Sequence, residues 1–293
     1  MGNEELRKFV FDLRDGVNKE LKFRGFSATA IDFFNDMPSK SKAPEWLKKK
    51  KEAGDFDILK SEFIDLVHDL CKILCLADVG FEDDFSGTKI IGRETKQGAL
   101  KGQPAPITGH HWCALHTKGR PKTEDTQFFI NHTSLGLRVG IYDKRFGSAE
   151  NSAEESKRWN SFLIRLDKNK EYIFNEYLET KKAGFDFVKT PPDEYFKHSI
   201  GKTFTPNSAN EMYEFVCDST PPYKQSFGLL KLIPHSQMKS SLLIDEILEC
   251  FVKTRKIYEK LQPRKFESYK RCISSIDVLN RRKEALKSSF EFY

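Results

Sequence analysis

Three short strand-like runs lie close together between residues 111 and 142, and they constrain the fold more than any other feature. The runs are His111–Thr117, Thr126–Asn131 and Leu137–Tyr142. In the last of them apolar and polar side chains alternate, which is typical of a strand with one buried face. Ser134–Gly136 is short enough to join the last two runs as a tight turn, so we expect an antiparallel hairpin.

Stretches with a helical spacing of apolar residues flank these runs on both sides. In each stretch the apolar side chains recur every three or four residues, as on the buried face of an amphipathic helix. Two further runs, Tyr213–Cys217 and Phe227–Ile233, are predicted to be strands, whereas Gly184–Asn210 is predicted to be mostly loop. The predicted helices are Glu4–Lys22, Leu59–Leu76, Glu154–Lys182 and Leu242–Leu261.

This order of elements predicts an α+β protein rather than one in which strands and helices alternate. We expect a central, mostly antiparallel sheet packed by several helices, with helical appendages at the N- and C-termini. A single domain with an N-terminal helix would span residues 1–263. Residues 264–293 would form a basic tail with a helix over Phe266–Leu286, in which Arg281 and Arg282 are candidate ligand-binding residues.

Charge is distributed unevenly along the chain. The net charge of the whole chain is +6, yet residues 253–293 hold 12 Lys and Arg against 5 Asp and Glu. This terminal stretch therefore carries all of the excess positive charge, and such an asymmetry suits a polyanionic partner. A helix face that is simply solvated would give the same count.

Composition also bears on the location of the protein. No apolar run approaches the roughly 18 residues that a membrane-spanning helix needs. The N-terminus contains acidic residues and lacks the apolar core of a secretory signal. The six cysteines are scattered and form no Cys-x-x-Cys pair, which is typical of reduced thiols. We therefore expect a soluble protein of the cytoplasm with no membrane partner.

The loop before the first strand-like run contains a candidate metal-dependent site. Asp84 is followed by Glu94 and Lys96 in an Asp…Glu-x-Lys arrangement. In a metal-dependent nuclease the two carboxylates of such an arrangement hold Mg²⁺, and the lysine orients the attacking water. These three residues are the candidate catalytic set, and a solvated loop is the alternative explanation.

Histidines gather in the first strand-like run. His110, His111, Cys113 and His116 lie close together, but side chains alternate along a strand, so the four cannot converge on one ion. A zinc site would need a further ligand such as His132, and a Cys113 nucleophile would need the same residue as its base. We therefore predict no metal site and interpret Cys113 as a buried, inert thiol.

Cations collect around the strand-like runs, next to aromatic residues. The aromatic residues are Trp112, Phe129, Tyr142 and Phe146. Phosphate contacts from cations and base stacking on aromatic rings are common means of binding nucleic acid. The alternative is that the rings belong to the core and the cations only cap strand ends. The candidate ligand-binding cations are Arg93, Lys118, Arg120, Lys122, Arg138, Lys144 and Arg145.

Short motifs along the chain resemble a bacterial family known only as a domain of unknown function. The family pattern is a Phe-Leu-x-x-Leu helix, a Trp-Phe pair, an Arg-Asp-x-Arg strand, a Lys-x-Pro loop and a Gly-Ile-Tyr strand. Over Phe26–Pro263 the resemblance implies a fold of this kind but no activity. The similar positions here are Phe33, Phe34, Met37, Trp46, Leu47, Arg93–Lys96, Lys101, Pro104 and Gly140–Tyr142.

Three functions stay open at this point. The leading hypothesis is an intracellular α+β protein that binds a polyanion, most simply DNA or RNA. The second is a metal-dependent hydrolase that uses Asp84, Glu94 and Lys96 with Mg²⁺. The third is a structural or assembly protein whose C-terminal helix docks on a partner protein.

Overall fold

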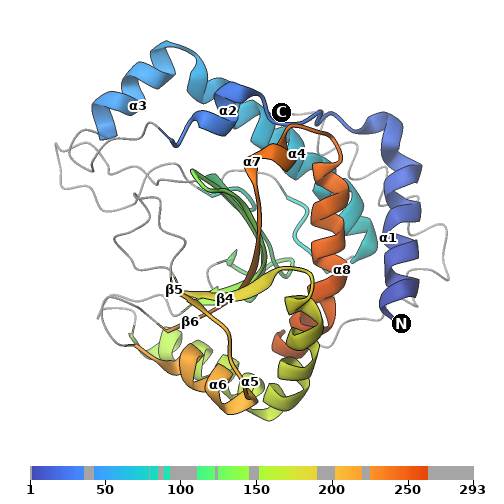
Figure 1. Ribbon diagram of the computed structural model, residues 1–293, viewed down its shortest axis with the longest axis vertical. Helices are drawn as coiled ribbons and strands as arrows, with labels where there is room; N and C mark the ends of the chain where they lie inside the picture. Colours follow the sequence, from blue (N-terminus) through green and yellow to red (C-terminus); the bar gives the residue numbers. More distant parts are fainter. Residues whose placement is uncertain are drawn as a thin grey trace.

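The structure is a computed structural model that describes residues 2–35, 43–78, 80–84, 89–92, 111–122, 125–144, 152–189, 202–219 and 225–262. In these ranges helices surround one sheet (Figure 1). The strands are β1 (His111–Leu115), β2 (Gln127–Thr133), β3 (Gly136–Lys144), β4 (Phe185–Lys189), β5 (Lys202–Phe204) and β6 (Ser226–Ile233). The helices are α1 (Asn3–Val17), the short 3-10 helix η1 (Asn18–Glu20), α2 (Ala28–Asp32), α3 (Ala43–Glu52), α4 (Asp55–Ala77), α5 (Ser152–Lys181), α6 (Ala209–Cys217), α7 (His235–Met238) and α8 (Leu243–Leu261).

All neighbouring strands of the sheet run antiparallel, in the order β1-β2-β3-β6-β4-β5. β2 and β3 form the predicted hairpin, with Thr133 opposite Gly136. In β3, Gly140 has a φ of +153°, and a Cβ there would lie 2.1 Å from the carbonyl oxygen of Leu229. Only glycine therefore allows β3 to approach β6 at this point. The predicted α+β fold with a mostly antiparallel sheet is confirmed.

One face of the sheet, called the inner face below, carries the main core. Alternate residues of β3 point to it, and Leu137, Val139 and Ile141 are fully buried there. Three helices cover it, because α4 contacts β1, α8 contacts β3 and α5 contacts β4. Figure 1 shows α4 and α8 next to each other on the right of the sheet, with α1 lying along them. The long helices bury apolar residues at a spacing of three and four, which gives each a continuous apolar face.

Aromatic side chains attach α5 to the sheet. Trp159 and Phe162 stack with their ring centroids 4.8 Å apart, and Phe162 meets Phe227 of β6 edge-on at 5.9 Å. Leu166, one turn further along the helix, is also fully buried. The helix predicted over Glu154–Lys182 is confirmed with nearly the same bounds.

Two predicted elements differ from the structure. Tyr213–Cys217, predicted as a strand, is the second half of α6. The Oγ of Ser208 accepts a hydrogen bond from the N–H of Glu211 at 3.2 Å, which caps the start of this helix. The cap decides the local structure although the residues that follow are strand-like in composition. Gly184–Asn210, predicted to be mostly loop, contains the two short strands β4 and β5, and residues 190–201 between them lie outside the described residues.

Two further predictions concern the C-terminal tail and a membrane-spanning helix. The basic tail of residues 264–293, with its predicted helix, lies outside the described residues. Among the described helices, none is long and apolar enough to cross a membrane.

A buried histidine lies on the inner face beneath α2. The ring of His132 is 5.1 Å from that of Phe26 and 5.5 Å from that of Phe34. Within the described part of the chain, neither nitrogen of this ring has a hydrogen-bond partner. Burial, with smaller contributions from His111 and His235, lowers the pKa of His132 to about 3.

The first prediction concerns the face of α5 that meets the sheet. Phe162→Ala should cost about 3–5 kcal/mol of the free energy of unfolding, because it truncates a fully buried ring. Ile164→Ala is the matched control, since that side chain is 68% exposed on the same helix. Its effect should stay within about 0.5 kcal/mol. Urea denaturation measures both, and equal losses would contradict the packing described.

The second prediction concerns how the stability of the protein depends on pH. An unfolded histidine binds a proton near a pH of about 6.5, whereas the folded protein keeps His132 neutral down to a pH of about 3. Its contribution to stability is therefore complete above the unfolded pKa and is lost as the pH falls toward the folded pKa. In His132→Leu, the free energy of unfolding should fall less steeply as the pH is lowered below about 6.5. Some dependence on pH should remain in the variant, because burial also lowers the pKa of His68, to about 4. A dependence in the variant as steep as that of the wild type would contradict this prediction.

Candidate functional site

The second face of the sheet, opposite the inner face, carries a small cluster of its own, and we call it the aromatic face. Residues that alternate with the core residues point to this side. Ala114, Phe129 and Leu230 are buried there, and Trp112 and Tyr142 pack against them while remaining partly exposed. The cluster is separate from the main core, so the sheet is apolar on both sides.

Three rings of the aromatic face form a row across β1, β2 and β3. The ring centroids of Trp112 and Phe129 are 5.7 Å apart, and those of Phe129 and Tyr142 are 4.9 Å apart and stacked. Phe129 in the middle is only 7% exposed. The row therefore offers partly exposed rings at its two ends and a buried ring between them.

Residues 91–92 lie beside β1 and contact Trp112. The N–H of Gly92 donates to the carbonyl oxygen of Trp112 at 2.7 Å. A Cβ on Gly92 would lie 2.1 Å from the indole ring, so only glycine can lie there. The ammonium of Lys122 is 4.5 Å from the centre of the indole, a cation–π distance. The same ammonium donates to the carbonyl oxygen of Ile91 at 2.8 Å.

Three of the predicted cations share one turn. Lys118, Arg120 and Lys122 lie between β1 and β2, and we call residues 118–122 the basic turn. β3 ends at Lys144 beside the start of β2, so the basic turn and the end of β3 lie at the same end of the sheet. Arg138 is apart from them, toward the β2–β3 hairpin, and is only 6% exposed.

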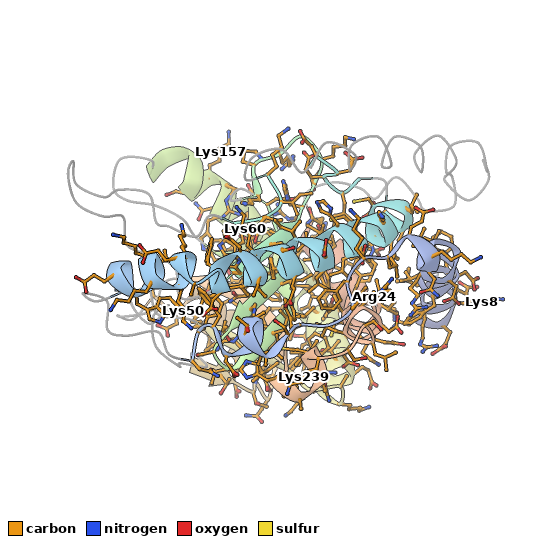
Figure 2. The ribbon with its side chains drawn as sticks, turned by 90° about the horizontal axis from the view of Figure 1, so that it is seen from above. Lys8, Arg24, Lys50, Lys60, Lys157 and Lys239 are labelled. Atoms are coloured by element: carbon orange, nitrogen blue, oxygen red, sulfur yellow. The ribbon has the colours of Figure 1, made fainter. Side chains whose placement is uncertain are left out.

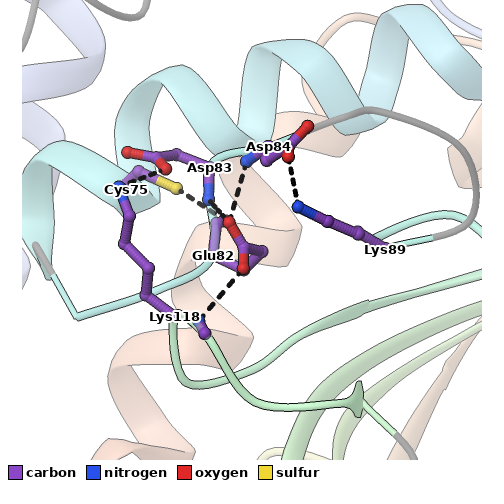
Figure 3. A network of polar contacts seen from close by, with 7 residues as sticks. Cys75, Glu82, Asp83, Asp84, Lys89 and Lys118 are labelled. Carbon is purple, nitrogen blue, oxygen red and sulfur yellow. Dashed lines mark hydrogen bonds and ion pairs between the residues drawn. The ribbon is translucent and has the colours of Figure 1, made fainter.

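A buried carboxylate holds the start of the basic turn (Figure 3). Glu82 is 5% exposed. It accepts hydrogen bonds from the N–H groups of Asp83, Asp84 and Gly119, each at 3.1 Å. The ammonium of Lys118 then pairs with the carboxylate of Asp83 at 2.6 Å. This acidic segment therefore fixes where the basic turn leaves the sheet.

A second buried group holds the other end of the turn, and the sequence did not point to it. Asp125 accepts a hydrogen bond from the N–H of Thr117 at 2.8 Å, which closes the turn. Asp143 pairs with Arg158 of α5 at 2.8 Å. Burial raises the pKa of Asp143, while the charge and hydrogen bond of Arg158 oppose that rise. Burial lowers the pKa of Arg165, two helical turns further along α5, while the charges of Asp143 and Asp125 oppose this change.

The acids at this end of the sheet are hidden, whereas the cations of the turn face solvent. Asp125 and Asp143 are each 2% exposed. By contrast the side chain of Lys118 is 52% exposed, and Arg120 is also exposed. The turn therefore presents Arg120, and Lys118 with its partner Asp83, to solvent.

The residues of the predicted nuclease set are only partly described. Asp84 forms an ion pair with Lys89, as Figure 3 shows. Glu94 and Lys96 lie outside the described residues. Across the described ranges, no group of three or more His, Cys, Asp or Glu side chains is arranged to hold a metal ion. Of the three residues proposed for a Mg²⁺-dependent hydrolase, only Asp84 lies in the described ranges, and its charge is balanced by Lys89.

The histidine strand is part of the packing. Cys113 is fully buried, and burial raises the pKa of its thiol to about 12, which keeps it protonated. It lies opposite Ile130. His111 lies opposite His132 and packs against the rings of Phe56 and Phe63. His110 is outside the described residues.

Other cations lie elsewhere. Figure 2 shows Lys8 on α1, Lys50 on α3 and Lys60 on α4, projecting from the helices rather than from the aromatic face. Lys50 is paired with Asp55 at 2.8 Å. The remaining predicted ligand-binding residues are outside the described part of the chain, and they are Arg93, Arg145, Arg281 and Arg282.

Comparison with known proteins identifies no relative of this chain. No protein-family model matches the chain, and no curated protein or solved structure matches it either. The functional argument therefore rests on the side chains described above.

The third prediction tests the anchor of the basic turn. Glu82→Ala removes the acceptor of three backbone N–H groups, so it should destabilise the protein by about 1–3 kcal/mol. Asp84→Asn is the control, because its pair with Lys89 is at the surface and such pairs contribute about 0–1 kcal/mol. Urea denaturation compares the two. A loss no larger for Glu82→Ala than for Asp84→Asn would mean that Glu82 does not hold the turn.

Proposed function

We propose that the protein binds nucleic acid across the aromatic face, with the basic turn contacting the phosphates. The observation that carries the proposal is the row of rings with a cation over one end, where the ammonium of Lys122 lies over Trp112. Lys144, another of the predicted ligand-binding residues, follows Tyr142 by two positions in β3. Rings that stack on bases beside cations that contact phosphates are a recurring arrangement in nucleic-acid binding proteins.

The exposure of the rings supports this use of the face. Phe129 is buried and supports the two rings beside it, whereas Trp112 and Tyr142 keep part of their surfaces exposed. A base added to an exposed ring contributes about 1–3 kcal/mol of binding free energy by stacking. Two such positions, together with phosphate contacts, would support binding that depends little on sequence.

The distribution of charge supports the same proposal. The buried Glu82, Asp125 and Asp143 stabilise the turn from inside, while Lys118 and Arg120 face outward. Lys118 is paired with Asp83, so the charge of the turn is partly balanced. Cations at a surface steer an approaching polyanion, an effect that raises association rates and is weakened by salt.

Other features extend the proposal beyond the described residues. Arg93, Arg145, Arg281 and Arg282 would add phosphate contacts, and the tail helix would dock on a partner protein by its apolar stripe. Among the described cysteines all are free thiols and most are buried, which suits the reducing cytoplasm.

The fourth prediction tests the basic turn. The wild-type protein should bind a fluorescently labelled single-stranded oligonucleotide at low salt, and log K should fall linearly with log salt. Replacing Lys118, Arg120 and Lys122 by Ala should weaken binding and reduce the salt slope by about 0.7 for each phosphate that the variant no longer neutralises. Fluorescence anisotropy between about 50 and 200 mM salt measures both quantities.

The matched control removes the same charge from elsewhere. Lys8, Lys60 and Lys239, which Figure 2 labels on other surfaces, are replaced together by Ala. This variant should keep both the affinity and the salt slope of the wild type. Equal weakening in the two triple variants would contradict a local site, and absence of binding to any DNA or RNA at low salt would end the proposal.

A further inference from the structure

The residue that follows α8 is tied into the base of the basic turn. Gln262 is 4% exposed. Its Nε2 donates a hydrogen bond to the carbonyl oxygen of Thr126 at 2.7 Å, and its Oε1 accepts one from the hydroxyl of Thr117 at 3.3 Å. Thr117 comes just before the basic turn, and Thr126 comes just before β2. One side chain therefore joins the end of α8 to both ends of the connection that carries the turn.

A second contact fixes the same end of α8. The guanidinium of Arg165, on α5, donates to the carbonyl oxygen of Leu261 at 2.8 Å. Burial lowers the pKa of Arg165, and the positive charge of Arg120 in the basic turn acts in the same direction. Charges in salt solution act on one another over about 10 Å or less. The end of α8 is thus held close to the turn through Arg165 as well as through Gln262.

Two cations follow Gln262 almost at once in the sequence. Arg264 and Lys265 come directly after Pro263. Neither lies in the described part of the chain. An extended chain advances at most about 3.6 Å per residue, so their Cα atoms lie within about 7 Å and about 11 Å of the Cα of Gln262. Covalent geometry alone therefore keeps both cations near the base of the basic turn.

This restriction separates the two cations from the other basic residues of the tail. Arg281 and Arg282 come much later in the sequence, so the position of Gln262 does not limit them in the same way. The sequence alone gives no reason to prefer one pair over the other. The hydrogen bonds of Gln262 supply that reason.

We propose that Arg264 and Lys265 extend the basic turn, so that one nucleic-acid strand contacts the turn and these two cations together. The inference rests on the proposed function and adds two residues that contact phosphate. Phosphates follow one another about every 3.4 Å along one strand of a duplex, so a strand lying on the turn has further phosphates close by. Cations tethered beside an occupied site meet these phosphates at a high effective concentration, and they strengthen binding for that reason.

The test uses the full chain and the labelled single-stranded oligonucleotide, between about 50 and 200 mM salt. Replacing Arg264 and Lys265 together by Ala should weaken binding about tenfold and reduce the salt slope by about 1.4, or about 0.7 for each lost phosphate contact. The matched control replaces Lys8 and Lys239, two exposed lysines on other surfaces, by Ala. It should keep the affinity and the salt slope of the wild type.

A second variant separates the position of the two cations from their charge. About ten Gly and Ser residues, which span about 17 Å on average, are inserted between Pro263 and Arg264. All charges remain, but the effective concentration of the two cations at the strand falls with the length of the linker. Binding should weaken toward that of the double Ala variant. The same insertion placed after Tyr293 is the matched control and should have no effect.

The outcomes separate this inference from the proposed function. Wild-type affinity and salt slope in the variant of Arg264 and Lys265 overturn the inference, as does equal weakening in the variant of Lys8 and Lys239. A double Ala variant that weakens binding while the internal insertion does not also overturns it, because the cations would then act without being held at the turn. In each of these cases, weaker binding on loss of the basic turn leaves the proposed function standing. Absence of binding by the wild type overturns both.

Discussion

Burial of the inner face of the sheet beneath α4, α5 and α8 is the constraint on which the other features depend. Side chains alternate along a strand, so fixing Leu137, Val139 and Ile141 in the core assigns every neighbour to the opposite side. A slip of one residue in register would exchange the two faces and bury the wrong set. The row of rings on the opposite side is therefore a consequence of the burial of the core.

The charged end of the sheet depends on a second constraint, which is that buried carboxylates need donors. Glu82 and Asp125 obtain theirs from the N–H groups of Gly119 and Thr117, at the start of the 117–125 connection. Asp143 obtains its donor from Arg158. Breaking such a contact leaves a charge or a polar group stranded, which is costly. The result is a connection held from inside by acids, with Lys118 and Arg120 directed outward and Lys122 over Trp112.

Much of the fold could be predicted from the sequence because the signal was local. The strand alternation in Leu137–Tyr142 and the short turn before it were enough for the β2–β3 hairpin. The helix α6 was missed, although its Ser208-x-x-Glu211 cap signal was present, because the residues after the cap are rich in strand-forming types. Short runs of this kind are ambiguous without tertiary context.

The candidate site could be predicted only in part. Lys118, Arg120 and Lys122 share a turn, so their proximity follows from the sequence alone. The pair between Asp143 and Arg158 does not, because it depends on where α5 packs against the sheet. Arg138 was grouped with the turn by composition, yet strand direction carries it toward the hairpin and into burial. Strand register, rather than closeness in the chain, decides which side chains meet.

The most direct test of the account is to find where a bound strand touches the protein. A single-stranded oligonucleotide carrying a photoreactive base, crosslinked to the wild-type protein and mapped by mass spectrometry, reports the residues in contact with bases. The account predicts crosslinks at Trp112 and Tyr142, at the two ends of the row of rings. Crosslinks confined to the helical surface around α3 and α4, or none above those of an unrelated protein, would contradict it.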